Sequence, residues 1–146
     1  MALDSRVPDL GLDLRKLPDL TDSETRSRLS PAAVTAFFKI VELWELKKED
    51  AVLLLGGISH GRYYDLKRDP KSAALTQDEL TRVSLLIGIF KALNILFSRK
   101  LANQWVSRPN HNPLFRDAPP LEYLTRGGML GLAAVRRLLD SRRGGR

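Results

Sequence analysis

Apolar side chains recur every three or four residues along most of this chain, which is the spacing of amphipathic helices. The first clear set with this spacing is Val34, Phe37, Val41 and Trp44. Just before them, Ser30 is a suitable N-cap and Pro31 suits the first helical position. The pattern therefore predicts a first helix over residues 31–46. Residues 1–29, rich in Asp and interrupted by prolines, are expected to form a flexible arm.

Two shorter helices follow, and a pair of glycines separates them. We expect the first of these over residues 48–55, ended by Gly56 and Gly57, because a glycine can adopt the left-handed conformation of a helix stop. Ser59 then caps a further helix that runs to Arg68. Two short helices joined by a glycine-containing turn are typical of a helix-turn-helix.

The second helix of this pair carries candidate contacts to nucleic acid. Tyr63 and Leu66 lie three residues apart and are expected to face the interior, so that the polar residues around them face outward. On a recognition helix, outward side chains meet base edges and phosphates. The candidate DNA-binding residues are Ser59, His60, Arg62, Tyr64, Lys67 and Arg68. The alternative is an ordinary solvated helix face, because Asp65 and Asp69 interrupt the basic residues.

The longest helix is predicted over residues 76–97. Thr76 is its N-cap, and Glu79 is the glutamate of a capping box. Two apolar stripes run along it, one of Leu80, Val83, Ile87 and Phe90 and the other of Leu86, Ile89, Leu93 and Leu96. A helix that is apolar on two sides must be covered on two sides. We expect one stripe to pack on the preceding helices, and the other to meet the C-terminal segment or a second copy of the chain in a homodimer.

The remaining third of the chain predicts three more helices, which makes the fold class all-α. Their expected ranges are 98–106, with Leu101, Ala102 and Trp105 facing inward, then 120–125 and 129–142. A turn over 108–113 precedes the second of them, and Gly127 and Gly128 end it. Trp105, Phe115, Leu132 and Val135 are expected to form a small core.

Composition limits the class of protein and the cellular location that the chain can have. The 146 residues are 43% hydrophobic, which is enough to bury an ordinary core, and they include no cysteine. No signal peptide is readable at the N-terminus, and the apolar run Val83–Phe97 is too short and too often interrupted for a membrane span. We therefore expect a soluble, intracellular protein.

The chain carries 24 basic and 17 acidic residues, a formal net charge of +7, and arginines crowd its last residues. Such an excess raises the affinity for polyanions, with nucleic acid as the obvious candidate, or it serves only solubility. Neither a phosphate-binding loop nor a zinc motif is present, and His60 and His111 have no partner at metal-ligand spacing. We expect no catalytic residue, no metal and no cofactor.

Taken in order, the C-terminal features resemble a known family. The features are Trp105, Asn112-Pro113, Phe115, Pro120-Leu121, Gly127-Gly128 and a final amphipathic helix, all downstream of the helix-turn-helix and the long apolar helix. Their order and spacing resemble the Xre/MbcA/ParS antitoxins. The resemblance covers about residues 30–139 and implies an Xre-like helix-turn-helix bundle joined by the long helix to a small toxin-binding domain.

The resemblance also implies a function. It implies a cytoplasmic bacterial antitoxin that inhibits a RES-type toxin, which consumes NAD or uses it for ADP-ribosylation, and that represses its own operon. It divides the chain into the arm (1–29), a DNA-binding and dimerisation region (30–97) and a toxin-binding domain with a basic tail (98–146). The candidate toxin-binding residues are Pro120, Leu121, Tyr123, Arg136, Arg137, Arg142, Arg143 and Arg146.

Two alternatives to this reading stay open. The terminal arginines could enter the anionic NAD site of the toxin, or they could form a solubilising tail or touch DNA. The whole chain could also be a stand-alone helix-turn-helix regulator without a toxin partner.

Overall fold

The computed structural model describes residues 18–143, and within this range the chain forms helices and no strand. The all-α prediction is confirmed. The helices are α1 (Ser23–Leu43), α2 (Lys48–Leu54), α3 (His60–Arg68), α4 (Gln77–Leu96), α5 (Arg99–Gln104), α6 (Pro120–Arg126) and α7 (Gly128–Arg143), with short 3-10 turns at Pro70–Ser72 (η1) and Trp105–Ser107 (η2). None of the helices in this range is long and apolar enough to cross a membrane.

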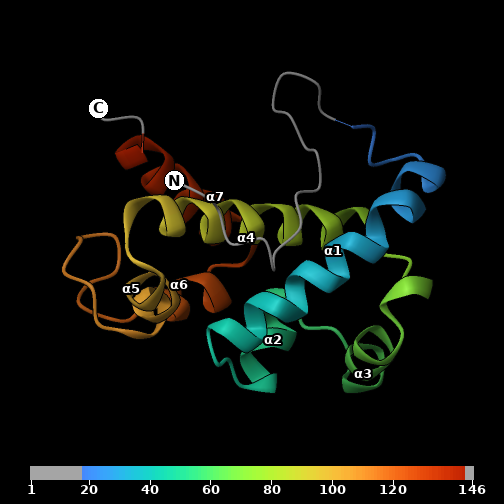
Figure 1. The fold of residues 1–146 in the computed structure, drawn as a ribbon, viewed down its shortest axis with the longest axis horizontal. Coiled ribbons are helices and arrows are strands. Elements are labelled where there is room, and N and C mark those ends of the chain that lie inside the picture. The colour runs from blue at the N-terminus through green and yellow to red at the C-terminus, as the bar shows by residue number, and fades with distance from the viewer. Residues whose placement is uncertain (1–17, 144–146) are drawn as a thin grey trace.

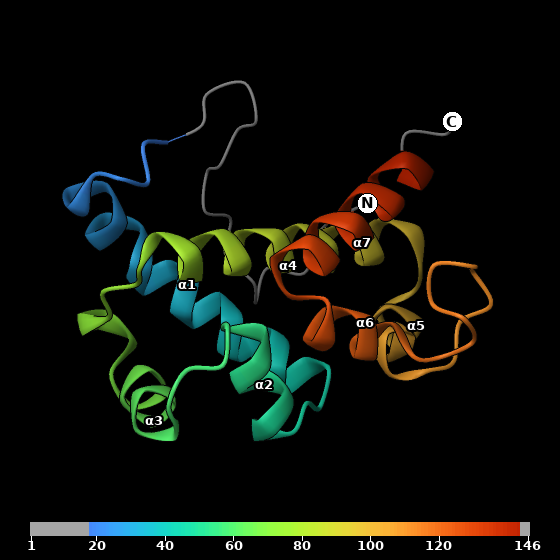
Figure 2. The ribbon, with the colours of Figure 1, turned by 180° about the vertical axis from the view of Figure 1, so that it is seen from behind.

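The long helix α4 is the centre of the molecule. In Figures 1 and 2, α1 crosses it near one end and α7 lies along it nearer the other, while α2, α3, α5 and α6 all lie on one side of it. The residues of both apolar stripes of α4 are buried, except for the partly buried Leu96, and α4 packs on both α1 and α7. Of the two expectations for the second stripe, packing against the C-terminal segment of the same chain is the one observed.

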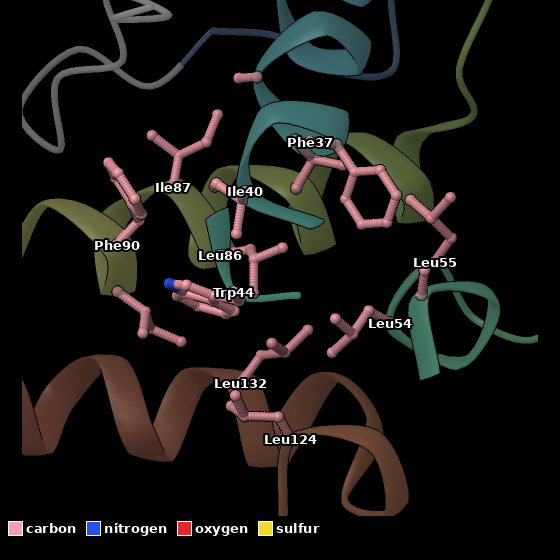
Figure 3. Close-up of a cluster of buried hydrophobic side chains, with 14 of the residues drawn as sticks. Phe37, Ile40, Trp44, Leu54, Leu55, Leu86, Ile87, Phe90, Leu124 and Leu132 are labelled. Carbon is pink, nitrogen blue, oxygen red and sulfur yellow. The ribbon is translucent and has the colours of Figure 1, made fainter. Parts of the chain in front are cut away.

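A single hydrophobic core joins the two halves of the chain. Figure 3 shows a cluster of buried side chains that includes Trp44 just after α1, Leu54 of α2, Leu86 of α4, Leu124 of α6 and Leu132 of α7. Direct packing of α2 on α6 adds to this connection. The segment that holds α2 and α3 is thus fixed relative to the C-terminal helices by shared apolar burial.

The start of the first helix corrects a prediction. α1 begins at Ser23 instead of Pro31, with the Asp22 carboxylate accepting hydrogen bonds from the Thr25 amide at 3.2 Å and hydroxyl at 2.8 Å. Pro31 lies inside the helix, so the arm predicted for 1–29 is too long by the helical residues from Ser23 onward. Residues 1–17 of that arm lie outside the described residues.

Packing explains why the helix passes through Ser30 and Pro31. Leu29 is buried and extends the inward stripe of Ala33 and Phe37 by one more turn. The buried Ser30 hydroxyl donates to the Arg26 carbonyl at 2.6 Å and accepts from the Leu75 amide at 2.9 Å. These contacts offset the hydrogen bond that Pro31 cannot make.

Two helices end in the same hydrogen-bonded motif, but with different residues at the left-handed position. After α2, Gly56 has φ 96°, and the Gly57 amide donates to the Val52 carbonyl at 2.9 Å, which confirms the predicted glycine stop. After α1, the Leu46 amide donates to the Val41 carbonyl at 3.0 Å, and the left-handed residue is Glu45 with φ 54°. A glutamate there is strained where a glycine would not be.

Candidate functional site

The helix α3 presents most of the predicted DNA-binding residues to solvent. His60, Tyr64, Lys67 and Arg68 are exposed, and Tyr63 and Leu66 are buried as predicted. Ser59 is the N-cap, since its hydroxyl accepts a hydrogen bond from the Arg62 amide at 3.1 Å. Its hydroxyl therefore has a structural partner already.

Arg62 does not project freely from this face, which corrects its assignment as an outward contact. Its guanidinium forms two hydrogen bonds to the Glu79 carboxylate, Nε to Oε2 at 2.9 Å and Nη2 to Oε1 at 2.6 Å. Nη2 also donates to the Ala74 carbonyl at 3.1 Å. The paired Glu79 side chain is only 7% exposed, so this ion pair ties α3 to the start of α4.

Glu79 also closes the capping box of α4. Its Oε1 accepts from the Thr76 amide at 2.9 Å, and the Thr76 hydroxyl accepts from the Glu79 amide at 3.1 Å. Burial alone would raise the pKa of Glu79, but the hydrogen bonds from Arg62 and Thr76, together with the charge of Arg62, outweigh it and lower that pKa. The carboxylate is therefore held in its charged form.

The exposed face of α3 is electrically mixed. Arg68 pairs with Asp65 at 2.5 Å, and the exposed Asp69 lies directly after the helix. The Tyr64 hydroxyl accepts from Lys48 of α2 at 3.3 Å, and the same ammonium lies 5.3 Å from the Tyr64 ring centre. Lys67 and His60 are the exposed residues of this predicted set that no described hydrogen bond or ion pair engages.

At the C-terminal end, the residues predicted on α6 serve mainly as packing. Pro120 is buried, which corrects its assignment to a partner surface. Leu121 and Tyr123 are partly buried against the core, and the Tyr123 ring meets Phe115 edge-on at 5.9 Å. Phe115, Leu132 and Val135 are buried as expected, whereas Trp105 is only partly buried.

The short helix α5 faces the core with a different set of residues from the predicted one. Ala102 and Val106 face the core, but Leu101, expected inside, is 47% exposed. The chain tightens into the 3-10 turn η2 directly after α5, so the inward face follows Ala102 and Val106 instead.

The arginines of α7 differ in their availability. Arg136 donates to Asp140 at 2.9 Å, and its guanidinium lies over Gly88 of α4, where a Cβ atom would approach it to 1.8 Å. Arg143 lies 3.6 Å from Asp140. Arg137 and Arg142 are exposed without a described polar partner, and Arg146 lies outside the described residues. Among the described residues of this predicted set, Arg137 and Arg142 are therefore the cations without a polar partner.

The helices α6 and α7 approach each other through small residues. A Cβ atom on Gly131 would come within 2.7 Å of the Tyr123 carbonyl oxygen, and one on Gly127 within 2.6 Å of the same atom. Real Cβ atoms do not tolerate such distances from backbone. The glycines thus set the close approach of these helices, and Gly131 is a requirement that sequence reasoning missed.

The connection between η2 and α6 is a compact loop held by side-chain to backbone hydrogen bonds. Asn110 Oδ1 accepts from the Asn112 amide and Asn112 Oδ1 from the Leu114 amide, both at 2.9 Å. The Asn110 amide donates to the Ala118 carbonyl at 3.2 Å and closes the loop. At its far end, Arg116 and Asp117 both have left-handed backbone, with φ 50° and 66°.

A surface groove of about 710 Å³ lies between this loop and α6. We call it the α6 groove, and its lining residues are Pro113, Leu114, Phe115, Arg116, Ala118, Pro119, Glu122, Tyr123, Arg126 and Gly127. Arg116 and Arg126 are both exposed, and no described hydrogen bond or ion pair engages either of them. Sequence reasoning missed both arginines, because nothing in the local pattern distinguishes them from other surface cations.

Comparison with known proteins identifies the class of this C-terminal region. The family described as the antitoxin Xre/MbcA/ParS C-terminal toxin-binding domain matches residues 92–145. That range holds the end of α4, the loop, the α6 groove, and α7. The region is thus the toxin-binding domain of an antitoxin.

A relative extends the similarity beyond this domain. The uncharacterised protein y4oB of Sinorhizobium fredii is 34% identical over 116 residues, which span 79% of this chain and 87% of the relative. No solved structure matches the chain. The chain belongs to the Xre/MbcA/ParS antitoxin family. It is the antitoxin of a toxin–antitoxin pair, and its partner is a toxin protein.

Proposed function

We propose that the chain binds and inhibits a RES-type toxin that consumes NAD or uses it for ADP-ribosylation, and that it represses the operon it shares with that toxin. The match of residues 92–145 to the toxin-binding domain carries the first part of this proposal. It favours an antitoxin over the alternative of a stand-alone regulator, for which such a domain would have no use.

Binding is tested by co-expressing the chain with the product of the adjacent gene and sizing the purified complex. The proposal expects a stable complex and a toxin whose NAD consumption falls to background at stoichiometric antitoxin. An adjacent protein that neither co-purifies with the chain nor consumes NAD would contradict the RES assignment.

The end of α7 is the proposed inhibitory element. A site for NAD must accept the anionic pyrophosphate, and an arginine can bind such a group through several N–H donors at once. Arg142 is exposed and has no polar partner among the described residues, whereas Arg143 lies near Asp140, so Arg142 is the described residue best suited to enter the site. Arg137, one and a half turns earlier, would then contact the rim of the site.

Deletion of residues 141–146 tests this role. The truncated chain keeps the buried Leu139, so α7 should stay packed on α4. We expect it still to bind the toxin but to leave most NAD consumption uninhibited. Full inhibition by the truncated chain would remove the tail from the mechanism.

For repression, we propose that α3 is the recognition helix, with His60, Tyr64 and Lys67 toward DNA and Arg62 holding the helix in place through Glu79. Because Asp65 and Asp69 share this face with Lys67 and Arg68, we expect weak sequence-independent binding and a shallow dependence on salt. Two copies would read two half-sites, with a dimer contact outside the covered stripes of α4.

DNA binding is tested by fluorescence anisotropy on the promoter fragment of the operon. Lys67→Glu should weaken binding, and Lys100→Glu, an equal charge change on exposed α5, should not. Equal binding by both variants would contradict the assignment of α3.

A further inference from the structure

The α6 groove combines an apolar lining with cations that have no partner in the described chain. Leu114, Pro119 and Tyr123, all only partly buried, contribute the apolar surface. Arg116 and Arg126 line the same groove, and neither makes a described hydrogen bond or ion pair. Glu122 is the carboxylate among the lining residues, and it forms no described ion pair with Arg126 one turn later. Both guanidinium groups are therefore free to bind an external anion.

The loop that forms one wall of the groove has a defined shape before any partner arrives. The hydrogen bonds of Asn110 and Asn112 fix its backbone, and the edge-on stack of Phe115 on Tyr123 at 5.9 Å fixes the loop to α6. Such prior order lowers the entropy lost when a partner binds.

The backbone at the end of the loop is strained. Arg116 and Asp117 are consecutive non-glycine residues with left-handed φ angles of 50° and 66°. Backbone strain of this kind costs free energy and is concentrated at functional sites. Here it places the backbone that carries Arg116 at the wall of the groove.

We propose that the α6 groove binds an acidic segment of the toxin, in which an apolar side chain packs on Pro119 and Tyr123 and flanking carboxylates pair with Arg116 and Arg126. This rests on the proposed function, since the occupant is the toxin. The groove lies entirely within the residues that match the toxin-binding domain, and its free charges complement an acidic partner. It is separate from the arginines at the end of α7, and it gives the complex affinity, whereas the tail acts on the NAD site.

The test is the dissociation constant between the full chain and the product of the adjacent gene, measured by calorimetry at low and high salt. The variant R116E/R126E should bind at least about tenfold more weakly than the original chain and should lose most of the salt dependence. The variant R116K/R126K keeps the charges and should retain most of the affinity, which separates charge from loop packing.

A matched control makes the same change in net charge elsewhere. R28E/K71E replaces exposed basic residues outside the matched domain and should leave the affinity within about twofold of the original. Thermal melting should be the same for all of these variants, because Arg116 and Arg126 have no described polar contacts to lose.

The outcomes separate this proposal from the proposed function. If the original chain binds the toxin and R116E/R126E binds equally well, the groove is not the site and the antitoxin role stands. If the original chain does not bind the adjacent protein, the proposed function fails and the groove proposal fails with it.

Discussion

Glu79 joins three segments through one carboxylate. It receives hydrogen bonds from Arg62 of α3 and from the Thr76 amide at the start of α4, and Arg62 also holds the Ala74 carbonyl. A buried carboxylate with charged and polar donors contributes to stability mainly in its ionised form. The position of α3 therefore depends on the charge of a residue that lies outside α2 and α3.

This arrangement predicts a dependence of stability on pH. Because the folded-state pKa of Glu79 lies below its ordinary value of 4.5, its contribution is complete above that value and is lost as the pH falls through the folded pKa. Glu79→Gln should lower the urea midpoint at neutral pH and flatten its decline below about pH 4.5. Parallel midpoint curves for the variant and the original chain would contradict the role of this carboxylate.

A second prediction concerns Glu45, which takes the left-handed position after α1 with φ 54°. Glu45→Gly should stabilise the fold by roughly 0.5–1 kcal/mol. This is the free energy gained by relieving the backbone strain, minus the cost of the greater conformational freedom that glycine gives the unfolded chain. The same replacement at exposed Glu42, inside the last turn of α1, should destabilise by about 1 kcal/mol. Chemical denaturation measures both changes in stability. A loss of stability in Glu45→Gly would contradict the inference that the backbone at Glu45 is strained.

At the scale of the elements, the closeness of α6 and α7 determines the shape of the toxin-binding domain. Gly127 and Gly131 let these helices approach at the Tyr123 carbonyl. The same residue carries the ring that lines the α6 groove. A change in the spacing of the helices would therefore also move the wall of the groove.

Gly131→Ala should destabilise the fold by about 1–3 kcal/mol, because the added methyl meets backbone that cannot move without its helix. Toxin affinity should fall as well, since Tyr123 is displaced. Leu130→Ala on the neighbouring residue, 82% exposed, is the control and should change stability by less than about 0.5 kcal/mol. If both variants melt alike, the helices are not in the close contact described.

Local sequence signals predicted most of these elements. The capping box at Thr76 and Glu79, the Ser59 cap and the glycines after α2 all stand at the ends where they were expected, because each acts on neighbouring backbone. The start of α1 was wrong because the burial of Leu29 and Ser30, a tertiary effect, outweighed a good local cap at Ser30.

The site was less predictable than the helices. Helical spacing predicted an outward Arg62, but its partner Glu79 is 17 residues away on another helix, so the spacing within α3 could not predict this ion pair. The left-handed backbone at Arg116 and Asp117 has no sequence signal, since neither residue is a glycine. The α6 groove therefore became visible only when the loop, α6 and their exposed arginines were placed together.

For the molecule as a whole, the shared core couples its regions. α4 packs on α1 and on α7, and α2 packs on α6, so the proposed DNA-binding face and the toxin-binding domain belong to one packed body over the described residues. A toxin bound at the α6 groove would be held at a fixed position relative to α3. We therefore expect a bound toxin to change the affinity of the chain for DNA, either because it fixes the position of α3 or because it overlaps with the DNA.

We infer that this chain neutralises a toxin through its C-terminal domain, and the growth of host cells is the sharpest test of this inference. Growth is measured in cells that express the adjacent gene alone, with the full chain, or with a chain carrying R116E/R126E and lacking residues 141–146. We expect growth arrest with the adjacent gene alone, full growth with the intact chain, and arrest again with the altered chain. Growth that is normal without the chain, or that the intact chain fails to restore, would contradict it.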